Sequence, residues 1–583
     1  METVTKEKTE QKTTKTVRVS GSEALLLSLM EEGVKTIFGY PGGAIMPLYD
    51  KLMDKEESKE LLHILTRHEQ GAIHAAQGFA RVTGEVGVCF ATSGPGATNT
   101  ITGIADAFLD STPIVCFTGQ VVSNLLGTDA FQETDVVGIS MPITKWNFQI
   151  TKAEEIPEAV ARAFYIAKSG RKGPVLIDLT KDAMINEFDF AYKKVTKIRS
   201  YMPEPITDEN ELKKAAELIN NAKKPLALIG QGVIQAEAEK ELKEFVEKTG
   251  IPVASTLLGL SALPDEHPLH TGMLGMHGNV APNVKTNEAD LLIALGMRFD
   301  DRVTGKVSAY APNAKKIHFE IDKAEINKII KVDVAVLGNL KNTLPKVMAL
   351  VKENSHKEWR ESFKEYDEQE HKRIIQKELY PEGDKITMGE VMRNINEVSN
   401  GEAVLVTDVG QHQMFACRYF NFKNTRGLVT SGGLGTMGFG LPAAMGVQVA
   451  LPYKKVVSVS GDGGFQMTLQ ELGTIAHNNL PVKMVVTNNN FLGMVRQWQE
   501  LFFDERYAST PITGPNLVVL ASAYGIKGEH VYKHEELKDA MQRMWEHDGP
   551  YLLEVHIEKK GNVFPMMPAG APVDQMIYGD ENK

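Results

Sequence analysis

Two polar side chains that could bind a cation each follow a predicted strand in the C-terminal third of the chain. Asp462 stands in a Gly-Asp-Gly-Gly turn after the β-branched run 456–460, and Asn489 follows the apolar run 482–487. Parallel strands end at one edge of a sheet, which is where open α/β sheets bind ligands. A carboxylate and an amide oxygen there suit a hard cation such as Mg²⁺, which takes further oxygens from phosphate and water.

A purely structural turn is the alternative explanation for this stretch. A Gly-Asp-Gly sequence is common, and alone it favours the structural turn. Paired asparagines at the end of the next strand make a phosphate-bound cation the more specific explanation, because the glycines let the backbone approach a phosphate closely. A helix is predicted at 465–478, between the two strands, and its first N–H groups would face the same phosphate.

The carboxylate of Glu69 is a second candidate for chemistry. It lies among Ala, Gly and Ile residues, where a predicted strand gives way to a helix. It could be a carboxylate that the helix dipole stabilises, or an acid whose pKa is raised in an apolar pocket. A zinc site with His68 and His74 does not fit the metalloprotease spacing of two histidines four apart. Beside Asp462 and Asn489, the catalytic acid becomes the leading hypothesis.

Length and composition set the limits on the fold. The chain has 583 residues, enough for three or four domains. A hydrophobic share of 42%, a charged share of 24% and a net charge of −11 are typical of a globular protein and argue against general nucleic-acid binding. Cys89, Cys116 and Cys417 stand in or beside apolar stretches without CxxC spacing, which indicates reduced thiols in the cytoplasm. No apolar run is long enough to cross a membrane.

Alternating helix and strand patterns predict an α/β fold with three doubly wound parallel-sheet domains. Charged stretches separate the domains, the first ending in a proline and the second expected to be a solvated helix and linker, and the polar N-terminus is expected to be disordered. We place a tail at 1–18, domains at 19–186, 204–350 and 386–558, linkers at 187–203 and 351–385, and a C-terminal lid or tail at 559–583.

Several motifs, taken together and in order, resemble the acetohydroxyacid (acetolactate) synthase large catalytic subunits, a family of thiamine diphosphate (ThDP) enzymes. They are FGYPGGAIMPLYD, RHEQGAIHAAQGFAR, TSGPGATN, GTDAFQE, GDGGFQMTLQEL and NNNFLGMVRQW. The resemblance extends from about residue 19 to about residue 577. It implies that the first domain binds the aminopyrimidine ring of ThDP, the central domain binds FAD, and the third binds the diphosphate and Mg²⁺.

The resemblance also implies roles for residues around ThDP. Glu69 would be catalytic, because its hydrogen bond to the aminopyrimidine promotes loss of the proton from the thiazolium ring. The metal ligands would be Asp462, Asn489 and the main-chain carbonyl of Phe491, and Met437 would wedge between the two rings of the cofactor. The positions expected to contact ThDP are Gly43, Glu69, Val409, Gly410, Gln411, His412, Gly435, Met437, Gly461, Asp462, Gly463, Gly464, Asn489, Phe491, Gly493 and Met494.

For FAD the residues alone give modest support. Gly230 and Gly232 permit close backbone approach without forming a GxGxxG motif, and Arg298 and Arg302 beside an acidic pair could equally form a surface ion-pair cluster. A formal GxGxxG at 433–438 could indicate a dinucleotide, which would not explain the paired asparagines. The resemblance implies FAD contacts at Arg171, Gly230, Gly232, Thr256, Leu257, Leu274, Met276, His277, Gly296, Arg298, Asp300, Arg302, Glu320, Ile321 and Asn339.

The resemblance further implies a reaction and its partners. Pyruvate would be decarboxylated on ThDP and joined to a second 2-ketoacid, pyruvate or 2-ketobutyrate, in branched-chain amino acid biosynthesis. A homodimer or tetramer in the cytoplasm, with a small regulatory subunit, is expected. An FAD-free catabolic acetolactate synthase or a pyruvate oxidase is the alternative; a non-catalytic paralogue is disfavoured by the residues present. Core packing could equally explain the helical spacing of Met494 and Trp498. Expected substrate contacts are Phe131, Gln132, Lys181, Arg302, Val495 and Trp498.

Overall fold

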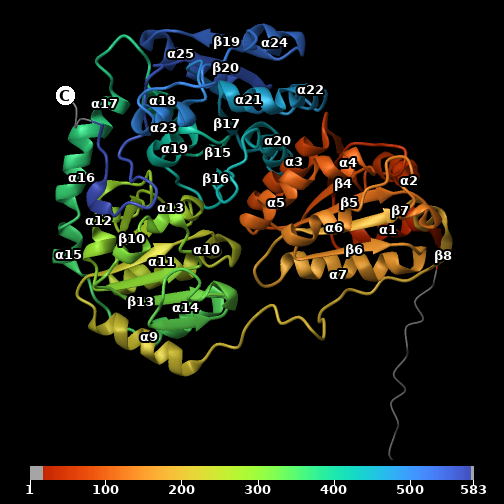
Figure 1. The fold of residues 1–583 in the computed structure, drawn as a ribbon, viewed down its shortest axis with the longest axis horizontal. Coiled ribbons are helices and arrows are strands. Elements are labelled where there is room, and N and C mark those ends of the chain that lie inside the picture. Colours follow the sequence, from red (N-terminus) through yellow and green to blue (C-terminus); the bar gives the residue numbers. More distant parts are fainter. Residues whose placement is uncertain (1–16, 580–583) are drawn as a thin grey trace, which may run out of the picture.

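The structure is a computed structural model and describes residues 17–579. This part of the chain forms three α/β domains, each around a six-stranded parallel sheet, so the predicted fold class is confirmed. In Figure 1 the second and third domains are stacked, the first lies beside them, and a long yellow segment runs from the first to the second. Most of the tail predicted for 1–18 lies outside the described residues. Among those described, no helix is long and apolar enough to cross a membrane.

The first domain has the strand order β3-β2-β4-β5-β7-β6. Its central strands are buried along their whole length, as parallel strands covered by helices on both faces should be. The strands are β2 (Thr36–Gly39), β3 (Leu62–Leu65), β4 (Gly87–Ala91), β5 (Ile114–Gln120), β6 (Trp146–Ile150) and β7 (Val175–Thr180), and the longer helices are α1 (Gly21–Glu31), α2 (Met46–Glu57), α3 (Glu69–Thr83), α5 (Ile101–Leu109) and α7 (Ile156–Lys168).

A small antiparallel pair joins the two ends of this domain. β1 (Val17–Ser20) pairs with β8 (Glu187–Phe190), from Val17 opposite Phe190 to Ser20 opposite Glu187. The start of the expected linker at 187–203 therefore forms part of the first domain, and so does the end of the expected tail. Short alternating segments of this kind are hard to predict, because their pairing partner lies far away in the sequence.

The second domain has the strand order β11-β10-β9-β12-β13-β14. Its strands are β9 (Pro225–Ile229), β10 (Val253–Ser255), β11 (His270–Met273), β12 (Leu291–Leu295), β13 (Lys315–Glu320) and β14 (Val334–Leu337). Its main helices are α9 (Glu209–Asn221), α10 (Gln231–Gln235), α11 (Glu239–Thr249), α12 (Val280–Glu288), α13 (Asp301–Thr304) and α14 (Leu340–Met348).

The charged segment after the second domain is more than a solvated linker. It forms α15 (Lys357–Glu361), α16 (Lys364–Glu370) and α17 (Gln376–Leu379), and buries Trp359 and Phe363 in a hydrophobic cluster of the second domain. The indole N–H of Trp359 donates to the carbonyl of Pro225 at 2.8 Å. Two aromatic side chains therefore anchor a stretch whose high charge predicted exposure, and that expectation is wrong for these residues.

The third domain has the strand order β16-β15-β17-β18-β20-β19. Its strands are β15 (Val404–Thr407), β16 (Leu428–Val429), β17 (Val456–Gly461), β18 (Lys483–Asn488), β19 (Lys527–Val531) and β20 (Tyr551–His556). Its main helices are α18 (Met388–Ser399), α19 (Gln411–Tyr419), α20 (Gly440–Ala450), α21 (Asp462–Thr468), α22 (Leu472–His477), α23 (Gly493–Phe502), α24 (Leu517–Ala523) and α25 (His534–Glu546).

The helix predicted at 465–478 is interrupted. A 3₁₀ turn at Leu469–Glu471 separates α21 from α22. The Thr468 hydroxyl donates to the carbonyl of Gly438, and the Glu471 carboxylate accepts from the N–H of Arg67 in the first domain. The break thus places a carboxylate where it ties two domains together, which a periodicity argument within one segment does not detect.

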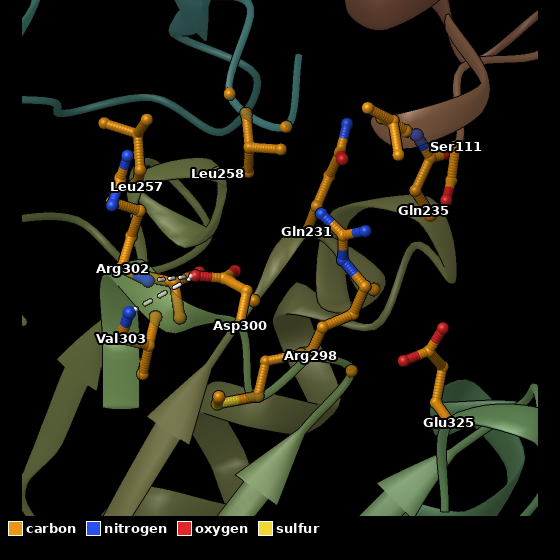
Figure 2. A pocket seen from close by; sticks show the side chains of 18 of the residues that line it. Ser111, Gln231, Gln235, Leu257, Leu258, Arg298, Asp300, Arg302, Val303 and Glu325 are labelled. Carbon is orange, nitrogen blue, oxygen red and sulfur yellow. Dashed lines mark hydrogen bonds between the residues drawn. The ribbon is translucent and has the colours of Figure 1, made fainter. Parts of the chain in front are cut away.

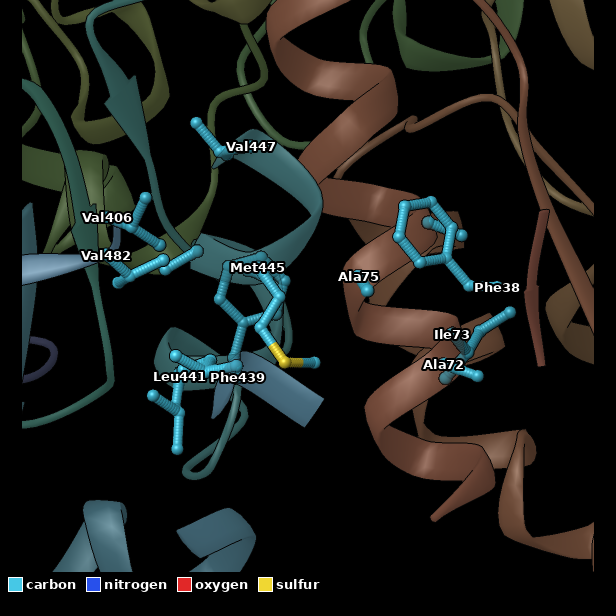
Figure 3. Packing of buried hydrophobic residues seen from close by; sticks show 14 of the residues in the cluster. Phe38, Ala72, Ile73, Ala75, Val406, Phe439, Leu441, Met445, Val447 and Val482 are labelled. Carbon is cyan, nitrogen blue, oxygen red and sulfur yellow. The ribbon is translucent and has the colours of Figure 1, made fainter. Parts of the chain in front are cut away.

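Helices α3 and α20 pack together at close range and join the first domain to the third. A Cβ atom on Gly446 would lie 1.8 Å from the carbonyl oxygen of Ala75, and one on Gly78 would lie 2.1 Å from that of Ala443. Figure 3 shows Ala75 on the side of α3 that faces α20 and Met445, with Ile73 on the opposite side of the helix. Small residues therefore let the two backbones touch, and they set where α3, which begins at Glu69, sits against the third domain.

Part of the C-terminal stretch packs against the third domain. Val563, Met566 and Met567 are buried, and the amide of Gln497 donates to the carbonyl of Val563. The role of 559–583 as a lid over a bound cofactor stays a prediction.

Candidate active site

Asp462 and Asn489 lie at the carboxyl edge of the third sheet. β17 and β18 are adjacent parallel strands in which Gly461 pairs with Thr487, so the residues that come after them are close across the sheet. Both side chains are buried. The Asn489 Oδ1 atom accepts a hydrogen bond from the N–H of Phe491 at 3.0 Å, which shapes the turn after β18. The edge therefore brings together the three residues expected to hold a metal.

The charge of Asp462 is poorly compensated by the protein. Burial raises the pKa of Asp462 to about 7, although the N–H groups of Gly463 and Asn490 act in the opposite direction. An adjacent cation would favour the ionised form and offset the cost of burial. A buried carboxylate beside an amide oxygen, at the first turn of α21, is a donor set that fits a hard divalent cation bound together with phosphate.

Two further polar groups point to a ligand at the start of α19. The Gln411 Oε1 and His412 Nε2 atoms are buried and have no hydrogen-bond partner within residues 17–579. Burial lowers the pKa of His412 to about 4, so its ring is neutral at physiological pH. A Cβ atom on Gly493 would lie 2.2 Å from Gln411 Oε1, and one on Gly461 would lie 3.0 Å from His412 Nδ1. The glycines thus leave a cradle at these groups, and the unpaired atoms suit a polar ligand.

Asp408 follows β15 at the same edge of the sheet and organises the loop beside it, and the sequence analysis did not single it out. Its buried carboxylate accepts hydrogen bonds from the N–H groups of Val409, Gly438 and Gly440. It thereby holds the segment that carries Gly435 and Met437. The φ of Gly435 is +70°, in the left-handed region that favours glycine. The signal was available, because Asp408 directly follows the apolar run 404–407, as Asp462 follows its own strand.

Glu69 is the first residue of α3 and is 8% exposed. Its Oε2 atom accepts a hydrogen bond from the Asn99 side chain at 3.0 Å. A Cβ atom on Gly96 would lie 3.1 Å from Glu69 Oε1, so the loop after β4 comes close to the carboxylate. His68 caps the helix through its ring nitrogen, which accepts from the N–H of Gln70 and excludes this nitrogen from a metal. Glu69 is thus a buried acid held by one amide partner.

A large cavity opens where the three domains meet. Its volume is about 630 Å³, and all fifteen positions expected around FAD line it. Val409, Gly410, Gly435, Met494 and Trp498 line it too, so it reaches the loops beside the diphosphate edge. Figure 2 shows Arg298 and Gln231 extending into this space from the second domain, with Ser111 of the first domain on the far side. The cavity can therefore hold an elongated ligand that ends at the third sheet.

The cavity residues have several kinds of partner. Asp300 caps α13 by accepting from the N–H groups of Arg302 and Val303, the two dashed bonds in Figure 2. Arg302 pairs with Asp301 in an exposed contact of 2.9 Å, which is the surface ion pair considered as the alternative. Gly232 donates its N–H to the carbonyl of Gly296, so its missing side chain serves the packing of α10 against a neighbouring loop. The role of Gly232 is therefore structural in this respect.

One cavity residue has an unpaired polar atom that a ligand could bind, and another joins two domains at the rim of the cavity. His277 Nδ1 is buried and has no hydrogen-bond partner in the described part of the chain, and burial lowers the pKa of this ring to about 3. Arg171 reaches across from the first domain and binds Glu325 at 2.8 Å and Asp322 at 3.2 Å. The first domain is thus tied to the rim of the cavity by an ion pair that the sequence gives no sign of.

Family models for the three domains of thiamine pyrophosphate enzymes match this chain in order. The N-terminal TPP-binding domain matches residues 19–139, the central domain 212–347 and the C-terminal TPP-binding domain 408–555. The acetolactate synthase isozyme 2 large subunit of Escherichia coli is 45% identical, over 96% of this chain and 99% of its own length. The acetolactate synthase large subunit of Lactococcus lactis is also 45% identical, over 97% of each chain. The chain belongs to the acetolactate synthase large-subunit family. It is therefore an enzyme of the ThDP-dependent class, as the motifs predicted.

Within this family framework, the expected substrate residues fall into two groups. Trp498 and Met494 share one face of α23 and line the cavity, and Met494 also packs against the hydrophobic core of the third domain. Phe131 is 88% exposed on the first domain and does not line the cavity within residues 17–579. Gln132, Lys181, Val495, Gly43 and Glu69 likewise do not line the cavity within residues 17–579. One chain therefore does not gather all the expected residues around one space.

Proposed function

We propose that this chain decarboxylates pyruvate and joins the remaining two-carbon unit to a second 2-ketoacid. Pyruvate as the second substrate would give 2-acetolactate, and 2-ketobutyrate would give 2-aceto-2-hydroxybutyrate. The observation that carries the proposal is the continuous cavity, which runs from the positions expected around FAD to Val409, Gly435 and Trp498. The products are precursors of the branched-chain amino acids, and we place the enzyme in that synthesis in the cytoplasm.

We propose that Asp462, Asn489 and the main-chain carbonyl of Phe491 hold Mg²⁺, which in turn binds the diphosphate. The unpaired side-chain atoms of Gln411 and His412 support this, because they lie beside the glycine cradle at the same edge. Bound ThDP would supply the carbon nucleophile of the reaction. The chain's own contribution is to orient the cofactor, to exclude water and to hold a proton at Glu69.

Glu69 would act through its carboxylate on the aminopyrimidine ring. Asn99 binds Oε2, so Oε1 can serve the ring nitrogen. Because Glu69 does not line the cavity within residues 17–579, we propose that it serves the cofactor of a second protomer in a homodimer. The exposed Phe131 and Met46 on the first domain support such an interface.

We propose that the second-domain part of the cavity binds FAD. Its length and volume suit an extended cofactor, and His277 and Gln231 offer polar groups along it. We assign FAD no net redox change in the synthase reaction. A small regulatory subunit is a further proposal, and it rests on the large-subunit names of the relatives.

Product analysis separates this function from its alternatives. The purified chain would be incubated with pyruvate, Mg²⁺ and ThDP, with and without FAD. Acetolactate that forms only with FAD supports the proposal. Acetolactate without FAD would indicate a catabolic synthase, and acetate with consumption of oxygen or quinone would indicate an oxidase.

The role of Glu69 has its own test. Glu69→Gln should lower acetolactate formation by about 100- to 10,000-fold, because general acid–base catalysis is worth that much. Binding of ThDP and Mg²⁺ should be unchanged. Glu57→Gln, an exposed glutamate on α2 of the same domain, is the matched control. Unchanged activity of Glu69→Gln would disprove the proton role.

A further inference from the structure

Three metal-binding side chains meet on the third sheet, apart from the residues assigned above. His530 on β19 pairs in register with Glu554 on β20, and His556 ends β20. One ligand atom from each lies within 4.8 Å of the other two, the only such group of three found among residues 17–579. In Figure 1 these two strands lie side by side at the top of the molecule.

The ring of His530 is oriented with a lone pair towards a carboxylate. Its Nε2 atom lies 3.2 Å from Asn516 Oδ1, which also accepts the N–H of Val519 and is therefore fixed as an oxygen. Nε2 must carry the proton in the neutral ring, which leaves Nδ1 with a lone pair. Nδ1 lies 3.1 Å from Glu554 Oε2, but it makes no hydrogen bond to this oxygen or to any other atom of the described residues. A positive charge between these two atoms would resolve the repulsion.

One oxygen of the Glu554 carboxylate accepts a hydrogen bond, and the other has no hydrogen-bond partner among the described residues. The residue is 2% exposed. Its Oε1 atom accepts from the Asn488 amide at 2.6 Å, and Asn488 is fixed in turn by accepting the N–H of Asn490. Its Oε2 atom has no hydrogen-bond partner within residues 17–579. Burying a carboxylate oxygen without a partner is costly unless a cation binds it.

His556 completes the group from the other side. Its ring stacks on Tyr532 with 4.3 Å between centroids and 11° between planes. Its Nε2 atom lies 3.9 Å from Glu554 Oε1 and likewise has no hydrogen-bond partner in the described range. Three buried ligand atoms thus converge on one point, and none of them has a hydrogen-bond partner there.

We propose that His530, Glu554 and His556 form a second metal site, for a divalent transition metal of the zinc class. Two imidazoles and one carboxylate are a recurrent ligand set for Zn²⁺ and its neighbours, whereas Mg²⁺ prefers oxygen. The ring N–H to Asn516 and the amide bond from Asn488 are the kind of outer contacts that orient metal ligands. Bonds of about 2.0–2.2 Å set tetrahedral ligands roughly 3.4 Å apart. His530 Nδ1 and Glu554 Oε2 are already 3.1 Å apart, and the partly exposed His556 ring would move towards them to complete the site.

The position of the site gives it a consequence for the cofactor edge. Asn488, which holds Glu554, directly precedes Asn489, and its side chain also binds the N–H of Asn490. A metal on Glu554 would thus stabilise the turn that presents Asn489. The site itself stands independently of the proposed function, because it uses none of the residues assigned to ThDP, Mg²⁺ or FAD.

Metal analysis on the full chain tests the proposal. With ThDP and excess Mg²⁺ present, equilibrium dialysis against Zn²⁺ should show one more zinc per chain for the wild type than for His530→Ala/His556→Ala. His477→Ala, which removes an exposed histidine of the same domain, should bind as much zinc as the wild type. Equal zinc in the wild type and the double variant would overturn the site.

A second measurement needs no variant, in case the double substitution impairs folding. Co²⁺ added to the wild type in place of Zn²⁺ should give intense visible absorption bands, which low-coordinate nitrogen and oxygen ligation produces. Only the weak bands of the hydrated ion would count against the site. Because acetolactate formation enters neither measurement, failure of the metal site and failure of the proposed activity are distinguishable.

Discussion

Replacing Gly446 by alanine tests the contact that joins the first and third domains. Gly446 lies inside α20, where alanine is normally better than glycine by about 1 kcal/mol. The structure predicts the opposite sign, because the new Cβ would lie 1.8 Å from the carbonyl oxygen of Ala75 and 2.6 Å from its carbon. Ordinary contacts are about 3.5 Å, so α3 and α20 would have to separate by more than 1 Å.

The cost of that separation can be bounded. Overpacking a close-packed core typically costs about 1–3 kcal/mol, and the clash here is with backbone, which cannot rotate away. We therefore expect Gly446→Ala to be less stable by about 2 kcal/mol after its helix propensity is subtracted. Because α3 begins at Glu69, the same shift should misplace the carboxylate, and an error near 1 Å can cost about 100-fold in rate.

Urea denaturation and acetolactate formation measure the two effects. Gly383→Ala is the control, since nothing lies within 4 Å of a Cβ atom there. The control should match the wild type in both assays. If Gly446→Ala is as stable as the wild type or more stable, the close helix contact is refuted, whatever happens to activity.

Three further predictions concern the cofactor edge and the cavity. The pKa of Asp462, about 7, is raised above the unfolded value, so its contribution to stability without metal is present below about pH 4 and lost as pH rises to 7. The Mg²⁺ affinity of the wild type should therefore fall by about tenfold per pH unit below 7, as measured by Mg²⁺ titration at a series of pH values. The Mg²⁺ affinity of Asp462→Asn should depend less on pH, because the diphosphate is then the titrating group at the site. The resemblance implies that Trp498 favours 2-ketobutyrate as second substrate, and its indole lines the cavity. Trp498→Leu should therefore lower the preference for 2-ketobutyrate over pyruvate by roughly 10-fold or more in competition assays, because one methylene in an apolar pocket is worth about that much. Gly493→Ala places a Cβ atom 2.2 Å from Gln411 Oε1 and 3.0 Å from the Asn489 amide, so ThDP affinity measured by fluorescence titration should drop by about 10-fold or more. Because Gln411 is buried and donates to Gln497 and Gly561, stability should also fall, by about 1–3 kcal/mol.

Much of the site could be predicted because its residues lie directly after strand ends. Asp462 and Asn489 were recognisable from spacing alone, since consecutive parallel strands deliver the residues after them to one edge of the sheet. Asp408 obeys the same rule and was missed only because its neighbours are not a known motif. The ion pair of Arg171 with Glu325 was beyond reach, because the two residues are far apart in sequence and meet through domain packing. The 3₁₀ turn at Leu469–Glu471, which interrupts the helix predicted at 465–478, could not be predicted for the same reason.

The polar groups at the cofactor edge also link binding to folding. Asp462 is buried with its pKa raised, and the Gln411 and His412 side chains each bury an atom without a partner among residues 17–579. Such groups reduce the stability of the free chain by about 1–3 kcal/mol each. A ligand that satisfies them offsets this cost, and at a hundred times its dissociation constant any ligand adds about 2.7 kcal/mol to stability. If Asp462 binds Mg²⁺ and the α19 groups bind the diphosphate as proposed, the protein should gain more stability from ThDP and Mg²⁺ together than from either one.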